Sequence, residues 1–201
     1  MITMKGAAVS AKLKEQVEKG LETLTWVPKL TIIREGENPD DISYEKGATK
    51  KLTSFGLEVE SKVFPGDISD EAFKKEFAAI NADASVDGIL MLRPLPKQIN
   101  EQDIEKMIDP AKDLDGISPV NIAKVFSGDT SGFAPCTAEA VVCMLKMNDI
   151  ALSGKRVAVV GRSMVVGRPL SMLLLHENAT VTICHSRTAS LPEVCREADI
   201  L

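Results

Sequence analysis

The segment Gly-Arg-Ser-Met-Val-Val-Gly at residues 161–167 has the residue types and spacing that most directly suggest chemistry. An apolar run at residues 156–160 precedes it, as expected for a parallel strand buried on both faces. From Val165 onward apolar residues recur at helical spacing, and Pro169 falls early enough to lie in the first turn. A turn from strand to helix directs backbone N–H groups and the positive end of the helix dipole outward. The segment therefore predicts an anion site, most often for phosphate.

The two glycines of this turn do not by themselves identify a ligand. Gly161 and Gly167 lack the middle glycine of the dinucleotide fingerprint G-x-G-x-x-G. An ordinary turn between strand and helix, with glycines for tight packing, would explain them equally. Arg162 and Ser163 favour a nucleotide, because a guanidinium and a hydroxyl in the turn can bind phosphate oxygens.

The next apolar run covers residues 179–184. In a dinucleotide-binding site, the residues after this strand determine whether NAD or NADP is preferred. A classical NAD site has an acidic residue about 20 residues after the glycine turn, and this acid binds the ribose 2′-hydroxyl. The run ends instead in His185, Ser186 and Arg187. Because a cation and a hydroxyl accommodate a 2′-phosphate, we predict NADP rather than NAD as the cofactor.

Three further positions carry side chains suited to ligand binding. Tyr44 follows a segment rich in Pro and Asp at a predicted helix start, where a tyrosine is more often a half-buried anchor than a catalyst. Asp113 and Asp115, with Lys112, lie in a polar loop and suit either a polar ligand or plain solvation. Thr137, in Pro-Cys-Thr before a predicted helix, would equally serve as an N-cap.

The composition is that of an α/β protein with an aliphatic core. Of 201 residues, 44% are hydrophobic and 4% aromatic, and the formal net charge of −5 argues against general nucleic-acid or anionic-membrane binding. No apolar run approaches the roughly 18 residues of a membrane span, so we expect a cytoplasmic, unprocessed protein. The four cysteines lack metal-ligand spacing and the chain has two histidines, which predicts reduced, mostly buried thiols and no metal site.

The candidate residues lie between alternating strand and helix patterns, which predicts an α/β fold. Strands are expected at residues 30–33, 57–64 and 86–92, in addition to the two runs above. Helices are expected at residues 7–24, 44–55, 70–81, 101–107 and 138–147, with a polar loop over residues 109–121. Asp41 or Ser43 would cap the second helix, and Gly56 would end it.

Taken together, these segments resemble the methylenetetrahydrofolate dehydrogenase/cyclohydrolase family along the whole chain. The matching motifs occur in the family's order: G-x-N-P-x-x-x-x-Y at 36–44, a strand with Pro-Leu-Pro at 88–96, P-x-K-D-x-D-G at 110–116, Pro-Cys-Thr at 135–137, G-R-S-x-x-V-G-x-P at 161–169 and A-T-V-T-x-C-H-S-x-T at 179–188. The resemblance implies a two-domain α/β protein with a folate-binding domain and a Rossmann-like NADP-binding domain, which we place at residues 1–137 and 138–201. It also implies a homodimer.

The resemblance also implies roles for the candidate residues. Tyr44 would stack on the folate and Asp115 would hydrogen-bond its pterin ring, and these two are the predicted catalytic residues. Leu92 and Pro94 would complete the substrate site. Cofactor binding is predicted for Gly161, Arg162, Ser163, Gly167, His185, Ser186 and Thr137.

Two departures from the family pattern concern its second reaction. Bifunctional members carry a lysine four residues after the tyrosine and a glutamine two residues before Pro-Leu-Pro, and both serve the cyclohydrolase step. This sequence has Ala48 and Leu92 at those positions. We therefore expect an NADP-dependent dehydrogenase that oxidises 5,10-methylenetetrahydrofolate in one-carbon metabolism, with weak or absent cyclohydrolase activity.

Two alternatives stay open. One is a fully bifunctional enzyme that produces 10-formyltetrahydrofolate, and the other is a non-catalytic folate- or nucleotide-binding fragment. Residues 197–201 resemble the entry to a further strand, and nothing in the chain matches the Gly/Pro-rich loop that the family places later. We therefore expect the C-terminal part of the NADP-binding domain to be missing.

Overall fold

The computed structural model describes residues 4–201, which form two compact units. The N-terminal unit comprises Ala11–Pro119, and the C-terminal unit comprises Val120–Leu201 with the described residues before Ala11. The first boundary falls within helix α1 (Gly6–Leu21), and the second at the start of helix α5 (Pro119–Ser127). Within residues 4–201 no helix has the length and apolar character needed to cross a membrane.

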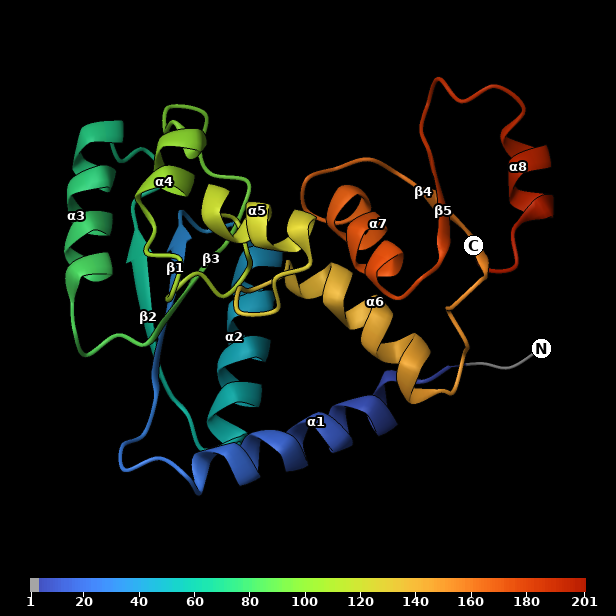
Figure 1. Cartoon of the computed structure of the whole chain (residues 1–201). Helices are drawn as coiled ribbons and strands as arrows, with labels where there is room; N and C mark the ends of the chain where they lie inside the picture. Colours follow the sequence, from blue (N-terminus) through green and yellow to red (C-terminus); the bar gives the residue numbers. More distant parts are fainter. Residues whose placement is uncertain (1–3) are drawn as a thin grey trace. The chain divides into compact units, whose positions relative to one another are not determined.

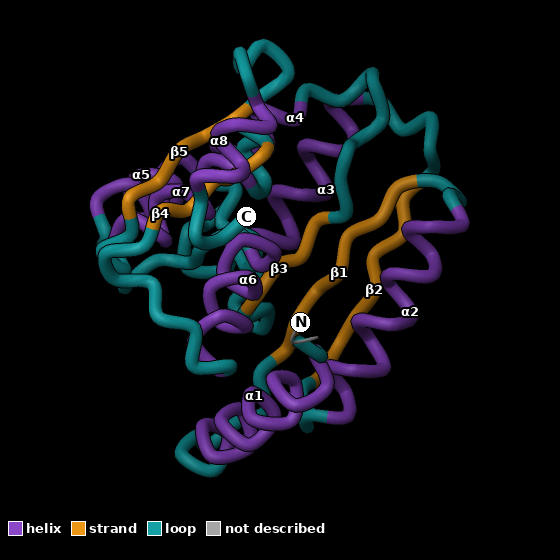
Figure 2. The backbone as a smooth tube through the Cα atoms, turned by 90° about the vertical axis from the view of Figure 1, so that its right-hand side faces the viewer, coloured by secondary structure: helices purple, strands orange, loops and turns teal. Residues whose placement is uncertain are grey.

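The N-terminal unit is built on a three-stranded parallel sheet of order β2-β1-β3. Its strands are β1 (Lys29–Glu35), β2 (Glu58–Phe64) and β3 (Gly88–Met91), and its further helices are α2 (Pro39–Ser54), α3 (Asp70–Ala82) and α4 (Glu101–Met107). Figure 1 shows α2 and α3 on opposite sides of the sheet, and Figure 2 shows the strands side by side with β1 in the middle. The predicted alternation of strands and helices is confirmed here.

The core of the N-terminal unit lies on the side of the sheet that faces α3. Ile33 of β1 and Phe73 of α3 are completely buried in the same apolar cluster. Arg34 points to the opposite side, where its guanidinium binds the carboxylate of Glu45 in α2. Because side chains alternate along a strand, Glu35 at the carboxyl end of β1 returns to the α3 side.

Part of the polar loop after α4 lies alongside β3. Ile89 pairs in parallel with Asp113 in an isolated bridge. The Ile89 N–H donates to the Lys112 carbonyl at 2.6 Å, and the Leu114 N–H donates to the Ile89 carbonyl at 3.3 Å. This bridge brings Asp115 next to the residues that follow β3.

The C-terminal unit contains a smaller parallel sheet. Strands β4 (Arg156–Val160) and β5 (Thr180–Cys184) pair in register, and Ile200 forms a parallel bridge to Val157 of β4. Helix α6 (Cys136–Met147) and helix α7 (Gly167–His176) share an apolar core with β4, and the short helix α8 (Leu191–Glu197) follows β5. The bridge at Ile200 agrees with the strand-like pattern of the last residues.

The turn from β4 to α7 depends on its two glycines. Gly161 has a φ of 141°, a backbone conformation that favours glycine. A Cβ added to Gly167 would overlap the carbonyl group of Gly161 and would lie 2.8 Å from the Arg162 nitrogen. The first residue of α7 therefore touches the backbone at the end of β4, and this contact excludes any larger residue at position 167.

The start of helix α2 differs from the sequence-based expectation. The helix begins at Pro39, and its N-cap is Asn38. The side-chain oxygen of Asn38 accepts the backbone N–H of Asp40 at 2.9 Å. Neither Asp41 nor Ser43 is the cap, because both lie inside the helix. An asparagine followed by proline is a local cap signal that the choice of Asp41 or Ser43 did not use. Tyr44 therefore lies in the second turn of α2 and not at its start.

Three expectations for the C-terminal unit are also wrong. Helix α5 begins at Pro119, inside the span expected to be a loop, because a proline is well tolerated at the first position of a helix. Helix α6 begins at Cys136, so Thr137 is its second residue and not its N-cap. Helix α7 begins at Gly167 and not at Val165, since Ser163 organises the preceding residues as a turn.

The cysteines are free thiols, but only Cys184 is buried. Cys136 is exposed in the first turn of α6, and Cys143 and Cys195 are partly exposed. The expectation of mostly buried thiols is therefore wrong. Three of the four cysteines lie on helices that have a solvent-facing side, which spacing along the sequence did not indicate.

Replacing Gly167 with alanine should destabilise the chain by about 1–3 kcal/mol, because the new methyl group forces the turn away from Gly161. Gly47→Ala is the matched control: it lies within α2 with nothing near its would-be Cβ, and the substitution should stabilise by about 0.5–1 kcal/mol. Urea unfolding followed by circular dichroism measures both. Equal stability of Gly167→Ala and the wild type would contradict the close approach.

Candidate active site

Three of the four predicted substrate residues of the N-terminal unit, Leu92, Pro94 and Asp115, lie at the carboxyl edge of its sheet, and Tyr44 lies in the second turn of α2. Leu92 and Pro94 follow β3 directly, and the Leu92 N–H donates to the Ile33 carbonyl at 2.9 Å. Pro94 is exposed, whereas Leu92 is only 8% exposed. Tyr44 is 58% exposed on α2. Tyr44, Pro94 and the partly exposed Asp115 thus have accessible side chains, whereas Leu92 is mostly buried.

Of the loop residues considered as ligand contacts, the structure distinguishes Asp115. Asp113 is 1% exposed, and its carboxylate accepts backbone N–H groups of Ile117 at 3.0 Å and Ser118 at 2.8 Å. Its role is therefore to hold the loop. The Lys112 ammonium donates to backbone carbonyls at the end of α3, at 2.8 and 2.7 Å, and is likewise structural. Asp115 keeps a partly exposed side chain.

Arg93 connects Asp115 to helix α4, which sequence reasoning did not anticipate. Its guanidinium lies 3.5 Å from Asp115, 3.2 Å from Glu101 and 3.4 Å from Glu105. Burial raises the pKa of the Glu105 carboxyl group in spite of the nearby guanidinium. Three carboxylates therefore share one cation. The available sequence signal was an arginine directly after a predicted strand, but sequence reasoning used only the Pro-Leu-Pro that follows it.

Glu35 is a second residue that sequence reasoning missed. It is 9% exposed, and its Oε1 is buried without a hydrogen-bond partner among the described residues. Burial raises its pKa to about 7, helped by the negative charges of Asp41 and Glu101 and opposed by its own backbone N–H and by Arg34. A carboxyl group at the end of a strand that is otherwise buried was the available signal. The predicted strand ended at residue 33 and therefore did not include Glu35.

The position of the family's lysine is occupied by a small apolar residue. Ala48 is partly buried one helical turn after Tyr44 on α2, while Lys46 and Lys50 are exposed. The Lys51 ammonium lies 5.1 Å from the centre of the Phe55 ring. Lys51 therefore contacts the C-terminal end of the helix, away from Tyr44.

In the C-terminal unit, Ser163 organises the predicted phosphate turn. Its Oγ accepts the N–H groups of Val166 at 3.1 Å and Gly167 at 3.4 Å, and its carbonyl accepts the Arg168 N–H at 3.0 Å. These donors at the start of α7 are therefore bonded within the chain and not free, contrary to the expectation from the turn. Arg162 and the Ser163 hydroxyl remain exposed at the positive end of the α7 dipole.

The residues after β5 lie beside this turn. The Gly161 N–H donates to the Cys184 carbonyl at 2.8 Å, so His185 follows at the same edge of the sheet. The His185 N–H donates to Thr188 Oγ1 at 2.7 Å, and His185 Nδ1 accepts the Arg187 N–H at 3.1 Å. His185 thus holds its own turn, and Ser186 and Arg187 are exposed at its tip.

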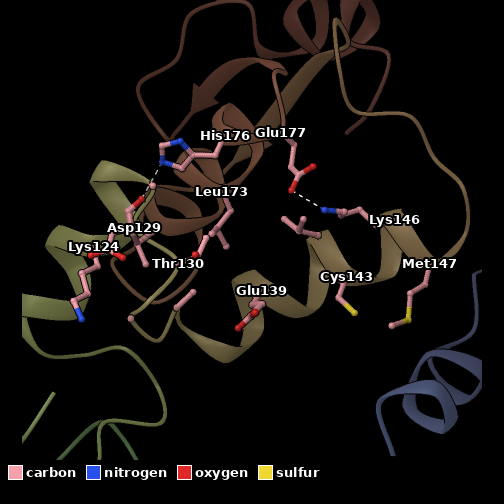
Figure 3. Close-up of a pocket in the computed structure, with 15 residues that line it drawn as sticks. Lys124, Asp129, Thr130, Glu139, Cys143, Lys146, Met147, Leu173, His176 and Glu177 are labelled. Carbon is pink, nitrogen blue, oxygen red and sulfur yellow. Dashed lines mark hydrogen bonds and ion pairs between the residues drawn. The ribbon is translucent and has the colours of Figure 1, made fainter. Parts of the chain in front are cut away.

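Thr137 is exposed on α6, and a cavity joins its segment to the turn. Pro135, Met164 and Arg168 line the same cavity of about 190 Å³. A different cavity, of about 550 Å³, lies between α5, the loop after it, α6 and the end of α7, as Figure 3 shows. None of the predicted cofactor residues lines this larger space. Among residues 4–201, no cluster of His, Cys, Asp and Glu side chains is arranged to hold a metal ion.

Glu35→Gln should change stability in a pH-dependent way. The folded chain binds the Glu35 proton more tightly than the unfolded chain, so stability is lost as pH rises from about 4.5 to about 7. The glutamine does not ionise and avoids this loss. The free energy of unfolding of Glu35→Gln relative to the wild type should therefore be about 3 kcal/mol more favourable at pH 8 than at pH 4. Urea unfolding at both pH values measures it.

The exposed neighbour Glu37 supplies the control for this comparison. Glu37→Gln removes the same charge and should stay within about 0.5 kcal/mol of the wild type at both pH values. A constant difference between Glu35→Gln and the wild type across this range would contradict the burial of an unpartnered acid.

Known proteins match both units of the chain. Residues 4–115 match the family "Tetrahydrofolate dehydrogenase/cyclohydrolase, catalytic domain", and residues 135–201 match "Tetrahydrofolate dehydrogenase/cyclohydrolase, NAD(P)-binding domain". The bifunctional protein FolD of Clostridium kluyveri is 46% identical over 100% of this chain and 72% of its own length. FolD of Carboxydothermus hydrogenoformans is 49% identical over 98% of this chain and 69% of its own.

Solved structures agree with these matches. The bifunctional FolD enzyme of Campylobacter jejuni has a TM-score of 0.93 at 35% identity and covers 98% of this chain and 71% of its own. The Trypanosoma brucei dehydrogenase-cyclohydrolase, solved with NADP and an inhibitor, has a TM-score of 0.91 at 28% identity over 100% of this chain and 70% of its own. The predicted two-domain α/β fold is confirmed, and the chain belongs to the tetrahydrofolate dehydrogenase/cyclohydrolase family.

Proposed function

We propose that this chain oxidises 5,10-methylenetetrahydrofolate to 5,10-methenyltetrahydrofolate with NADP, in one-carbon metabolism, and that its cyclohydrolase activity is weak or absent. The dehydrogenase half of the proposal rests on the match to both domains of the family. The observation that carries the second half is Ala48 on α2, since the lysines around it are exposed or bound elsewhere.

In the N-terminal unit, Tyr44 and the residues at the carboxyl edge of the sheet bind the folate. Tyr44 offers an aromatic face for stacking, and Pro94 and Leu92 provide apolar contact at the exit of β3. Asp115 accepts two parallel N–H bonds from the 2-aminopyrimidinone edge of the pterin. Arg93 holds this carboxylate in place from the α4 side, at 3.5 Å.

In the C-terminal unit, the exposed groups fit a dinucleotide with a 2′-phosphate. Arg162 and Ser163 offer charge and a hydroxyl at the start of α7, and Ser186 offers a hydroxyl after β5, where an NAD site would have an acid. Gly161 and Gly167 allow the backbone approach that this turn needs. His185 and Thr137 complete the set of proposed cofactor residues, His185 by shaping the turn that carries Ser186.

The reaction requires positioning more than proton transfer. A hydride leaves the carbon between N5 and N10 of the folate, and the nitrogen lone pairs support the cation that forms. NADP supplies the hydride acceptor when bound. The residues of the chain orient the substrate through Tyr44 and Asp115, and the carboxylates around Arg93 favour the developing positive charge.

The proposal also includes a homodimer and a cytoplasmic location, and both rest on the family resemblance. The fully bifunctional enzyme is the alternative that the names of the relatives favour, since the curated relatives above are called bifunctional FolD. Those names leave open whether a chain with Ala48 and Leu92 hydrolyses the methenyl product. An assay of this chain decides it.

Assays with NADP and NAD test the cofactor. The chain should reduce NADP with 5,10-methylenetetrahydrofolate, with kcat/KM at least about tenfold higher than for NAD. Ser186→Asp restores the acid of an NAD site and should lower or reverse this preference, because it repels the 2′-phosphate. Ser190→Asp, at another exposed serine, is the control and should leave the preference unchanged. A wild-type preference for NAD would refute the assignment.

The cyclohydrolase step is tested by following the methenyl product after its formation. In the wild type it should accumulate and then decay only at the uncatalysed rate. Ala48→Lys with Leu92→Gln should accelerate the decay at least about tenfold, because an amine beside Tyr44 can activate water. Ala48→Met with Leu92→Gln fills the same space without an amine and should not. Decay accelerated by the wild-type chain would refute the proposal.

A further inference from the structure

Glu35 combines burial with an unmet hydrogen bond. It is the last residue of β1 and is 9% exposed, and its Oε1 finds no partner among residues 4–201. Burying a polar atom without a partner is costly, so such an atom is expected to have a ligand or ordered partner in the working protein. The question is which ligand this oxygen faces.

The strand register places Glu35 beside the proposed folate residues. Ile33 pairs with Met91 at the end of β3, and the Leu92 N–H donates to the Ile33 carbonyl just beyond this pair. Glu35, two residues after Ile33, therefore emerges at the same edge of the sheet as the segment that follows β3. Its side chain lies on the α3 side of the sheet by alternation, the side to which α4 contributes Glu101.

The charges around Glu35 favour its neutral form. Asp41 of α2 and Glu101 of α4 are negative and oppose ionisation. Arg34 on its own strand is the nearby cation, but its guanidinium already binds Glu45 of α2. Arg93 is likewise engaged by the carboxylates of α4 and by Asp115, and β2 presents the apolar Phe64 at the paired position.

We propose that Glu35 is a further substrate-binding residue, whose neutral carboxyl group hydrogen-bonds the pterin ring of the folate beside Asp115. A pterin edge presents both N–H donors and oxygen or nitrogen acceptors. Asp115, as a carboxylate, satisfies only donors, whereas a neutral carboxyl group also donates. The two acids thus divide the task. This inference rests on the proposed function and adds a pH dependence to its substrate binding.

The first test is the pH profile of KM for 5,10-methylenetetrahydrofolate. In the wild type, KM should rise about 30-fold from pH 6 to pH 8.5, as the Glu35 proton with its pKa of about 7 is lost, while kcat changes little. Glu35→Gln keeps a donor and an acceptor but cannot ionise, so its KM should be flat and close to the wild-type value at pH 6. Glu37→Gln, at an exposed acid two residues on, should follow the wild-type profile.

The second test does not depend on turnover. Calorimetric titration with 5-formyltetrahydrofolate at pH 7.5, in two buffers of different ionisation enthalpy, reports proton uptake on binding. The wild type should take up most of one proton and Glu35→Gln none, whereas a purely structural role for Glu35 would leave the uptake equal.

The outcomes separate the inference from the proposed function. A wild type that turns over the substrate with a KM independent of pH, or a Glu35→Gln variant with the wild-type profile and proton uptake, overturns the role of Glu35 and leaves the dehydrogenase assignment intact. A wild type that binds no reduced folate and reduces no NADP overturns both. If Glu35→Gln fails to fold, as judged by circular dichroism, the pH profile and proton uptake of the wild type still decide.

Discussion

The parallel pairing of β1 with β3 is the constraint on which the candidate folate site depends. Because Ile33 pairs with Met91, the chain leaves both strands at the same edge of the sheet, where Glu35 and Arg93 both emerge. The bridge between Ile89 and Asp113 adds the loop after α4 on the other side of β3. Three segments distant in sequence therefore meet through backbone hydrogen bonds, and their side chains inherit a fixed spacing.

That spacing produces an imbalance of charge. One guanidinium, that of Arg93, lies within 3.5 Å of a carboxylate of Asp115 and close to two more on α4. One cation cannot neutralise three carboxylates. Burial is the main cause of the raised pKa of Glu105 and of Glu35, and the negative charge of Glu101 adds to it in both cases. Under the proposed function, the excess negative charge suits a substrate that gains a positive charge as hydride leaves.

The sequence predicted the alternation of elements well, because buried parallel strands such as 156–160 and amphipathic helices such as 70–81 have distinct periodicities. It also predicted the turn at Gly161 between a strand and a helix, which the structure contains. The role of Asp115 stays a prediction. Sequence reasoning failed where a residue's role depends on contacts distant in sequence. Nothing local shows that Arg93 meets α4 or that the N–H groups at the start of α7 are taken by Ser163.

The helix boundaries show the same limit at short range. The cap of α2 is Asn38 followed by proline, a local signal that the expectation of a cap at Asp41 or Ser43 did not use. By contrast, the exclusion of side chains at Gly167 depends on how closely α7 approaches the end of β4. A glycine in a motif indicates that something comes close, but only the fold shows that the neighbour is the Gly161 carbonyl group.

The same site features bear on why one reaction would occur without the other. A negative environment lowers the energy of the methenyl cation, and this also makes the cation a poorer target for water unless a base or amine activates the water. Ala48 and Leu92 supply neither, and Lys51 is bound over Phe55. A site that stabilises its product and lacks a group to activate water is suited to forming the cation and releasing it intact. The absence of the lysine and the carboxylates around Arg93 therefore act in the same direction.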